Sequence, residues 1–545
     1  MVITLVLFGV ANSLFAADPP IVPKRGGTLR LATGDPHSMD PALVFSSAEV
    51  MLAYFVFNTL LDPNPEGALI PVLVESLPVT SPDGLTHTFR LRQGVSFSNG
   101  RELVADDVVY SLERLFDSKT GSDSTYFRSI KGGAAFEAAR KKEAASTSGG
   151  PRLNAGRWIE PMTVSGLGAL DRYTVQIQLD KPDLSFLHVI ACPPAAIVPR
   201  EEVERTGRPF GSRPVGTGPF VLKQWVRGAR MRFERNPHYF RAGRPSLDAV
   251  DVILTVDMTT QGMMFERGEL DFQHYITDPD FARFKRDSKL QPLLQRVIGT
   301  SPTFIFLNCE LPPFTNRLVR LALNYAVNKE ALVKTLGHRC VLGRGPLPLV
   351  VSGFNRNLPE YPYDPPRARA LLAEAGLPNG FETTLWSQRD DPRWMKVALF
   401  VQQNLMDVGV TVHLKEVGYS TLVEASGRRR TVPMGVYDWV TIFDDPKETL
   451  DTLLNGNNIT EERCSNNAFY SNPRVDQLFR DAVAESDATR RLEIYREIEG
   501  LVVQDAPWIF LVQLNTEMIV QPWLKGFKPR GFWPTARLEN TWIER

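Results

Sequence analysis

The stretch SPDGLTHTFRLRQGVSFSNGRELVADDVVYSLERL, residues 81–115, shows the two kinds of local structure from which this chain is built. In HTFRLRQG, residues 87–94, polar and apolar side chains alternate, which predicts a β-strand. In VADDVVYSLERLF, residues 104–116, the pattern predicts a helix that Asp106 or Asp107 opens near its N-terminus. A strand followed closely by a helix is typical of an α/β protein.

The same alternation continues along the chain without a fixed repeat. Residues 316–337 predict a helix that begins at Asn316 and a second helix after a break at Asn328. In YDPPRARALLAEAGLPNG, residues 363–380, Asp364 caps a helix start and Gly376 provides a left-handed stop. We therefore expect α/β domains of the kind that bind ligands between sheets or lobes.

Length and composition narrow the class of protein. A chain of 545 residues is too long for one hydrophobic core, so two or three domains are expected. Lys plus Arg equals Asp plus Glu, 62 each, which argues against a dedicated binder of nucleic acid or of anionic membranes. Beyond the N-terminus no stretch approaches 18 consecutive apolar residues, so the mature chain is expected to be soluble and not inserted in a membrane.

The N-terminus reads MVITLVLFGVANSLFAADPP. The apolar run from Val2 to Phe15, followed by Ala16 and Ala17, predicts a secretory signal peptide over residues 1–17 and a periplasmic mature protein. A buried N-terminal helix is the alternative. A signal peptide usually begins with a short segment rich in Lys and Arg, and because this segment is missing we expect that the true start lies upstream. No cysteine lies near the predicted cleavage site, which argues against a lipid anchor.

Motifs for chemistry are missing from the sequence. The seven histidines are scattered without HExxH spacing, and no GxSxG, kinase or β-lactamase motif set occurs, so we expect no metal site, no cofactor, no catalytic residue and no enzymatic activity. The Gly-rich GTGPF, residues 216–220, is interpreted as a structural turn, because Pro219 removes an amide and no Lys-Ser/Thr follows. One or two disulfides of unknown pairing are possible among the four cysteines, which are Cys192, Cys309, Cys340 and Cys464.

Several stretches, in order along nearly the whole mature chain, resemble the family 5 extracellular solute-binding proteins, the peptide/nickel class that serves ABC transporters. They are MDPAL (39–43), the opening stretch at 81–115, PVGTGPFVLKQW (214–225), RNPHYFRAGRPSLDAVDV (235–252), FLNCELPPFTNRLVRLALNYAVNKEALV (306–333), YDPPRARALLAEAGLPNGF (363–381), YSNPRVDQLFRDAV (470–483) and QDAPWIFLVQ (504–513). The polar segment 131–158, interpreted as a surface insertion, is the largest departure.

The resemblance implies an α/β, two-lobed periplasmic-binding-protein fold of the large three-domain type (class II, cluster C-like), with a hinge between the lobes. It also implies a monomer that delivers a small ligand, a peptide or a peptide-like compound, to the permease subunits of an ABC importer. Competing hypotheses are a sensory or chaperone-like receptor with the same fold and a secreted hydrolase. The expected domains are 24–62 with 206–299 and 513–545 (domain I), 63–205 (domain II), both in one lobe, and 300–512 (domain III) in the other.

The resemblance also points to a ligand site in YDWVTIFDDP, residues 437–446. Peptide-binding members typically carry Trp-x-x-Asp-x-x-Asp/Glu-Pro, where the first Asp meets the free amine of the peptide. Here Trp439, Asp445 and Pro446 match, but Ile442 stands at the amine-binding position and cannot accept a hydrogen bond or balance a charge.

Two explanations of Ile442 remain open. The carboxylate role has moved to Asp444 or Asp438, which a strand period of two would place on the same face as Ile442. Alternatively, and preferred for a standard peptide, the ligand has no free α-amine there and is an amide, a sugar, an opine-like conjugate or a metal chelate.

The same comparison with the family suggests further ligand contacts. Trp439 offers an apolar face for stacking and one N–H donor. Arg389 in WSQRDDP, residues 386–392, resembles the arginine that holds a ligand carboxylate in dipeptide-binding members, although the spacing is one residue short. Weaker candidates, each as well explained by packing, are Tyr437, Trp386 and Tyr419.

Overall fold

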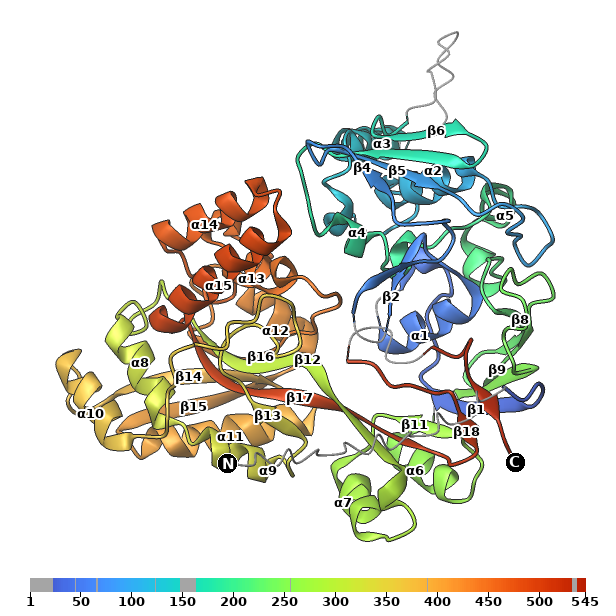
Figure 1. Cartoon of the computed structure of the whole chain (residues 1–545). Helices are drawn as coiled ribbons and strands as arrows, with labels where there is room; N and C mark the ends of the chain where they lie inside the picture. The colour runs from blue at the N-terminus through green and yellow to red at the C-terminus, as the bar shows by residue number, and fades with distance from the viewer. Residues whose placement is uncertain are drawn as a thin grey trace, which may run out of the picture.

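The computed structural model describes residues 23–44, 46–64, 67–122, 124–147, 163–254, 256–389, 391–531 and 537–545. The predicted signal peptide lies outside these ranges, as does the part of the predicted insertion from 148 to 158. Figure 1 shows two lobes joined by two long strands, β12 (Leu294–Leu307) and β17 (Trp508–Val520). Lobe 1 holds the chain before β12 and after β17, and lobe 2 holds the chain between these strands.

A mixed sheet in the order β11-β17-β12-β16-β14-β15, with β13 paired to β17, runs through lobe 2, and its edge strand β11 comes from the chain of lobe 1. The parallel part consists of β14, β15 and β16, and β16 runs antiparallel to β12. The remaining strands of this sheet are β11 (Phe272–His274), β13 (Cys340–Leu342), β14 (Phe381–Gln388), β15 (Val410–Val417) and β16 (Met434–Asp438). Its helices are α8 (Arg317–Ala326), α9 (Lys329–Thr335), α10 (Pro365–Glu374), α11 (Pro392–Met406), α12 (Tyr419–Ser426), α13 (Pro446–Leu454), α14 (Pro473–Ala484) and α15 (Ala488–Asp505).

Lobe 1 contains two larger sheets, in the orders β1-β10-β9-β8 and β4-β5-β7-β6. The first is formed by β1 (Thr28–Thr33), β8 (Phe220–Val226), β9 (Arg230–Arg235) and β10 (Ala249–Leu254). The second is formed by β4 (Val79–Thr80), β5 (Thr86–Arg90), β6 (Leu167–Asp171) and β7 (Thr174–Gln178). Short pairs are β2 (Leu61–Pro63) with β3 (Leu69–Pro71) and β18 (Leu524–Lys525) with β19 (Trp542–Ile543). The helices are α1 (Ser47–Val56), α2 (Ala105–Glu113), α3 (Gly133–Thr147), α4 (Phe186–Val189), α5 (Arg200–Thr206), α6 (Met258–Glu266) and α7 (Asp278–Arg286).

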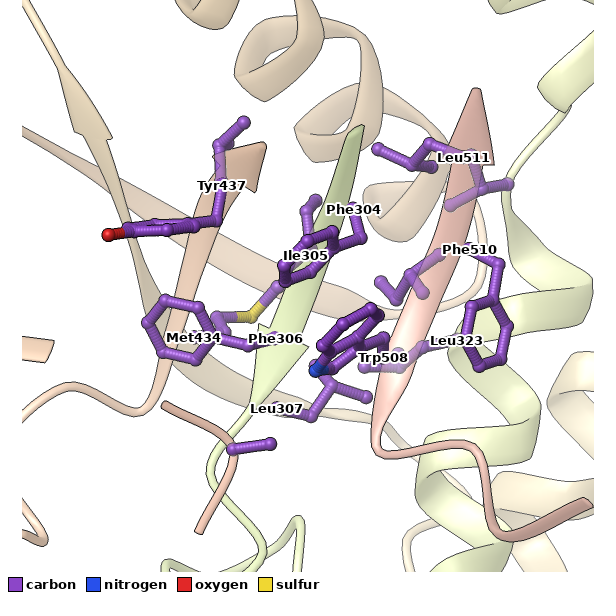
Figure 2. Close-up of a cluster of buried hydrophobic side chains, with 14 of the residues drawn as sticks. Phe304, Ile305, Phe306, Leu307, Leu323, Met434, Tyr437, Trp508, Phe510 and Leu511 are labelled. Atoms are coloured by element: carbon purple, nitrogen blue, oxygen red, sulfur yellow. The ribbon is translucent and has the colours of Figure 1, made fainter. Parts of the chain in front are cut away.

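The buried side chains gather in separate clusters, the largest of which fills lobe 2. Figure 2 shows its centre, where the rings of Phe304 on β12 and Trp508 on β17 stack with centroids 3.6 Å apart. A second cluster lies under the sheet β4-β5-β7-β6, and a third under the sheet β1-β10-β9-β8. Each lobe therefore has its own core, while the predicted division into three domains stays a prediction.

Where the two long strands cross between the lobes, their pairing is irregular. The register of β12 against β17 shifts between Ile298 and Ser301 and again between Thr303 and Phe304. A Cβ at Gly299 would lie 2.6 Å from the Leu514 carbonyl oxygen, so a larger residue would force the strands apart. Such bulges bend a strand pair locally, which places a bend between the two cores.

Several local predictions are confirmed. Asn316, Asn328 and Asp364 each accept a hydrogen bond from a backbone N–H at the start of a helix. Gly376 has φ +82°, the left-handed conformation that ends α10. In GTGPF the Gly218 N–H donates to the Val56 carbonyl at 2.7 Å, so this turn is structural.

The predicted strand over 87–94 is shorter, since β5 ends at Arg90. All four cysteines lie within the described ranges and are free thiols, so no disulfide forms. Among the described residues, no helix combines the length and the apolar character needed to cross a membrane.

Candidate functional site

The carboxyl ends of the three parallel strands of lobe 2 point toward lobe 1. Asp438, the last residue of β16, pairs with Thr303, near the point where β12 enters lobe 2. Beyond it, the Trp439 N–H donates to the Pro302 carbonyl at 3.3 Å and the Thr441 N–H to the Thr300 carbonyl at 3.1 Å. The chain thus follows β12 toward lobe 1. In α/β sheets this edge is where ligands bind.

Four of the sequence-predicted residues stand at this edge, directly after the strands. Arg389 follows β14, Tyr419 follows β15, and Asp438 and Trp439 end and follow β16. Arg389 and Tyr419 are exposed. The Arg389 N–H donates to the Val417 carbonyl at 2.8 Å, which extends the pairing of β14 with β15.

Two of the weaker candidates lie within lobe 2. Tyr437 is buried in the core, next to Phe304 in Figure 2. The centroids of the two rings are 6.1 Å apart. Burial raises the pKa of Tyr437. Trp386 on β14 is half-buried, and the Lys415 ammonium lies 3.7 Å from its ring centroid. Both residues pack within lobe 2, and their role in ligand binding stays a prediction.

Trp439 uses its N–H donor inside lobe 2. The indole Nε1 donates to both carboxyl oxygens of Glu448, each at 3.1 Å. Glu448 is 2% exposed, and burial raises its pKa from 4.5 to about 8, so that it is mostly protonated at neutral pH. Only the ring of Trp439 therefore remains to contact a ligand. Sequence reasoning missed Glu448, because a Glu in the first turn of a helix is ordinarily an exposed residue.

Ile442 lies in a contact between the two lobes. It packs against the apolar cluster under the sheet β4-β5-β7-β6, and the neighbouring Phe443, 6% exposed, belongs to that cluster. The Phe443 ring stacks on His188 with centroids 6.0 Å apart. The Lys447 ammonium lies 2.8 Å from Asp183. We call this the rim contact. It consists of Ile442, Phe443 and Lys447 of lobe 2 with Asp183, Ser185 and His188 of lobe 1. Figure 1 shows α4 of lobe 1 on the side that faces α13.

The reasoning that placed Asp438, Ile442 and Asp444 on one strand face is wrong, because β16 ends at Asp438. Asp444 instead accepts hydrogen bonds from the Ser352 N–H at 2.5 Å and from its hydroxyl at 2.8 Å. Asp445 caps α13 and receives both terminal nitrogens of Arg491 at 2.8 and 2.9 Å, in a buried ion pair. Both carboxylates therefore hold the turn before α13.

Asp438 is the remaining acidic candidate. Burial raises its pKa to about 6, and the nearby Arg393 opposes that rise. Arg393 approaches Asp438 only to 3.9 Å, which is longer than a hydrogen bond, while it pairs with Asp391 at 2.7 Å. Sequence reasoning missed Arg393, although the Asp-Pro pair before it marks a helix start that would have placed it at the strand edge.

On the opposite side of the site, charged groups join the lobes beside the long strands. Arg339 of lobe 2 pairs with Asp278 at 2.7 Å, donates to the Ile276 carbonyl at 2.7 Å, and pairs with Glu517 on β17 at 2.6 Å. Lys396 on α11 also pairs with Asp278. We call this the hinge contact; it consists of Arg339 and Lys396 with Ile276, Asp278 and Glu517.

A hollow of about 690 Å³ lies elsewhere, in lobe 1 between the β2–β3 pair and the C-terminal segment. Two arginines that line it are engaged: Arg537 pairs with Asp62, and Arg530 donates to the Pro63 carbonyl. These contacts tie the C-terminal segment to β2, which is a structural role. The candidate site is therefore the strand edge between the rim contact and the hinge contact.

The two-lobed arrangement agrees with comparisons to known proteins. The family model described as bacterial extracellular solute-binding proteins, family 5 Middle, matches residues 68–461. The chain belongs to this family. The fold class and the family expected from the sequence are thereby confirmed.

Relatives of this family 5 protein differ in the ligands they are named for. Heme-binding protein A of Haemophilus influenzae (strain ATCC 51907 / DSM 11121 / KW20 / Rd) is 30% identical, over 91% of this chain and 89% of that protein. Glutathione-binding protein GsiB of Escherichia coli O1:K1 / APEC is 29% identical, over 97% of this chain and 95% of that protein. The ABC transporter-associated periplasmic binding protein DppA of Helicobacter pylori, solved with the peptide STSA, has a TM-score of 0.76 at 25% identity, covering 96% of this chain and 99% of that one. Family 5 proteins are solute-binding components of ABC importers and not a class of enzymes, which confirms the general function expected from the sequence.

Proposed function

We propose that this protein is the periplasmic ligand-binding component of an ABC importer and that it closes its lobes around a small peptide-like ligand which places no α-ammonium group at residue 442. The observation that carries the proposal is the rim contact. Ile442 packs on an apolar cluster of lobe 1, so no carboxylate stands where a peptide amine would need one.

The neighbouring acids do not replace the missing carboxylate. Asp444 is engaged by Ser352, and Asp445 by Arg491. Leaving an ammonium unpaired in a closed site costs several kcal/mol, so a ligand with its amine at Ile442 would be rejected. Asp438 is the acid that can still meet a positive group of the ligand, and it lies at the strand edge rather than in the rim contact.

A binding protein of this type signals its ligand by closing. The ligand must bind the closed arrangement better than the open one, since equal affinity for both would shift nothing. The rim and hinge contacts join the lobes on either side of the strand edge, so a ligand there would touch both lobes. The permease subunits are the expected partner of the closed form.

The first experiment is native mass spectrometry of the protein purified without refolding. A co-purified small molecule is the expected result, and its mass distinguishes a peptide-like compound from an opine, a sugar or a metal chelate, the alternatives that Ile442 also favours. Absence of any bound molecule, together with no thermal shift on adding glutathione, hemin or dipeptides, would overturn the transport function.

The second experiment tests the missing amine anchor by calorimetry. Peptides bound by the protein are compared with their N-acetylated forms, and acetylation is expected to change Kd by less than about threefold, because no carboxylate at residue 442 pairs with the amine. Binding of free peptides that acetylation abolishes would show that another acid, with Asp438 first, has taken the role.

A further inference from the structure

Lobe 1 presents one aromatic side chain to lobe 2 in a strained conformation. Tyr275, directly after β11, has φ +61°, in the left-handed region that bulky residues rarely adopt. Such strain costs about 1–3 kcal/mol, persists only where the surroundings impose it, and concentrates at functional sites. Tyr275 is nevertheless 49% exposed, so burial of its ring does not explain why the strain is kept.

Two hydrogen bonds and one ring contact hold Tyr275 in place. The Gln273 side-chain amide donates to the Tyr275 carbonyl at 3.2 Å and to the Met258 carbonyl at 3.0 Å. The Tyr275 phenol donates to the Ser47 hydroxyl at 2.8 Å, at the start of α1. The His274 ring lies 3.9 Å from the Tyr275 ring, centroid to centroid. These contacts therefore hold the tyrosine ring in one position.

Lobe 2 carries Arg393 at the start of α11, the helix whose Lys396 takes part in the hinge contact. The Arg393 side chain is 40% exposed, and it meets both Asp391 and Asp438 through the same nitrogen, Nη2. Arg339 of lobe 2 donates to the carbonyl of Ile276, the residue after Tyr275, at 2.7 Å, so this segment lies against lobe 2. Burial raises the pKa of Tyr275, and the positive charge of Arg393 opposes that rise.

The hinge contact connects α11, the helix that carries Arg393, to the segment that follows Tyr275. Lys396 lies three residues after Arg393 on α11, and such residues share one face of a helix. Lys396 pairs with Asp278, which in turn lies three residues after Tyr275. One ion pair thus fixes the start of α11 against the segment that carries Tyr275.

From this geometry we propose that Tyr275 and Arg393 form a ligand subsite that holds a planar aromatic group of the transported molecule between the two lobes. A tyrosine ring and a guanidinium both stack on flat conjugated groups. The acids beside Arg393 do not oppose an uncharged aromatic ring, whereas they would repel a carboxylate placed there. The subsite rests on the proposed function, because it needs a ligand that bridges the lobes.

Calorimetry with three probes tests the subsite. N-acetyl-Ala-Trp and mesoporphyrin IX carry planar groups, and N-acetyl-Ala-cyclohexylalanine carries a saturated ring of comparable apolar character. Wild type is expected to bind an aromatic probe about tenfold more tightly than the saturated one. Failure of both aromatic probes to bind wild type overturns the subsite, and a ligand found by native mass spectrometry would leave the transport function standing.

Variants separate stacking from folding. Tyr275→Gly removes the ring and relieves the left-handed backbone, so it is expected to lose the aromatic preference without losing thermal stability. Tyr275→Phe keeps the ring and is expected to keep the preference. Arg393→Gln is expected to reduce the preference and Arg393→Lys to reduce it less, because the planar guanidinium is lost in both but the charge in only one.

Matched controls come from α10, at the outer end of lobe 2 in Figure 1. Tyr363→Ala and Arg367→Gln remove an exposed tyrosine and an exposed arginine and are expected to leave all three affinities unchanged. An aromatic preference that survives Tyr275→Gly, or an equal loss for aromatic and saturated probes, would contradict the subsite and assign Tyr275 a structural role.

Discussion

The two contacts that join the lobes are built from different physical interactions. In the rim contact, Ile442 and Phe443 pack on an apolar cluster, and a single ion pair, between Lys447 and Asp183, accompanies them. In the hinge contact, Arg339 and Lys396 converge on Asp278, whose side chain is 47% exposed. One contact depends on buried apolar area, and the other on charges that salt can screen.

The difference matters because the two contacts move by different amounts when the lobes open. The hinge contact includes Glu517 of β17, a strand that runs through both lobes, whereas no residue of the rim contact belongs to β12 or β17. Opening therefore exposes the apolar rim while the hinge charges stay near one another. We infer that the rim contact sets most of the free energy of closure.

The largest expected effect is on the turn that carries the rim contact. Asp445→Asn leaves Arg491 buried without its carboxylate and is expected to lower the free energy of unfolding by about 3–5 kcal/mol. Urea denaturation followed by tryptophan fluorescence measures it. Asp444→Asn, which alters only contacts with Ser352, should cost less than about 1 kcal/mol. Similar losses for the two variants would show that the buried pair does not anchor the turn.

A charge at the centre of the rim should open the lobes. Ile442→Asp places a carboxylate against the apolar cluster of lobe 1 and is expected to destabilise the closed form by about 2 kcal/mol or more, with a larger radius of gyration in X-ray scattering. Val440→Asp, at a position 41% exposed, is the control and should leave the radius unchanged. Tighter binding of a free dipeptide by Ile442→Asp, at an unchanged radius, would instead restore the amine-site interpretation.

The buried acid behind Trp439 should make stability depend on pH. Glu448 has a pKa of about 8 in the folded protein against an ordinary 4.5, so between these values the folded state holds a proton that the unfolded state has lost. Wild-type stability is therefore expected to fall as pH rises from about 4.5 to 8. Glu448→Gln keeps an acceptor for the Trp439 N–H and removes the contribution of Glu448, while Glu499, whose pKa burial also raises to about 8, keeps its own. The variant is expected to gain about 2–3 kcal/mol relative to wild type at pH 8 compared with pH 5.

Thermal unfolding at both pH values measures this effect. Glu493→Gln, at an exposed position on α15, is the control and should follow the wild-type profile. A Glu448→Gln profile parallel to that of wild type would mean that Glu448 is ionised in the folded protein.

The smallest expected effect is at the hinge. Asp278→Asn removes the negative charge that pairs with Lys396 and Arg339 and is expected to cost about 0.5–1 kcal/mol, because these partly exposed pairs are screened. Fluorescence energy transfer between dyes on the two lobes should show wild-type closure weakening modestly as salt rises, and the variant should lose that dependence. A salt response of the variant equal to that of wild type would show that other charges are responsible.

Much of the local structure could be predicted from short stretches of sequence. The caps at Asn316, Asn328 and Asp364 and the stop at Gly376 depend only on residues within a few positions, so their patterns predict the helices correctly. The strand-period argument over 438–444 failed because the regular strand ends at Asp438 and only two backbone hydrogen bonds, from Trp439 and Thr441, follow β12 beyond it.

The candidate site was less accessible to sequence reasoning. Arg393 and Glu448 were missed, since an arginine and a glutamate near helix starts are common on surfaces and only burial or a facing lobe distinguishes them. Trp439 was expected to offer a stacking face and an N–H donor to the ligand, but its N–H donor is taken by Glu448.

Composition, helix signals and ordered family motifs are properties of the chain read in order, and they were enough to establish an α/β solute-binding protein of family 5. The meaning of Ile442 was decided by residues some 250 positions earlier, at 183–192, which folding brings beside it. The burial of Glu448 and the rise of its pKa arise in the same way. They depend on which surfaces exclude water together, and that is set by the packing of distant segments and not by any neighbouring residue.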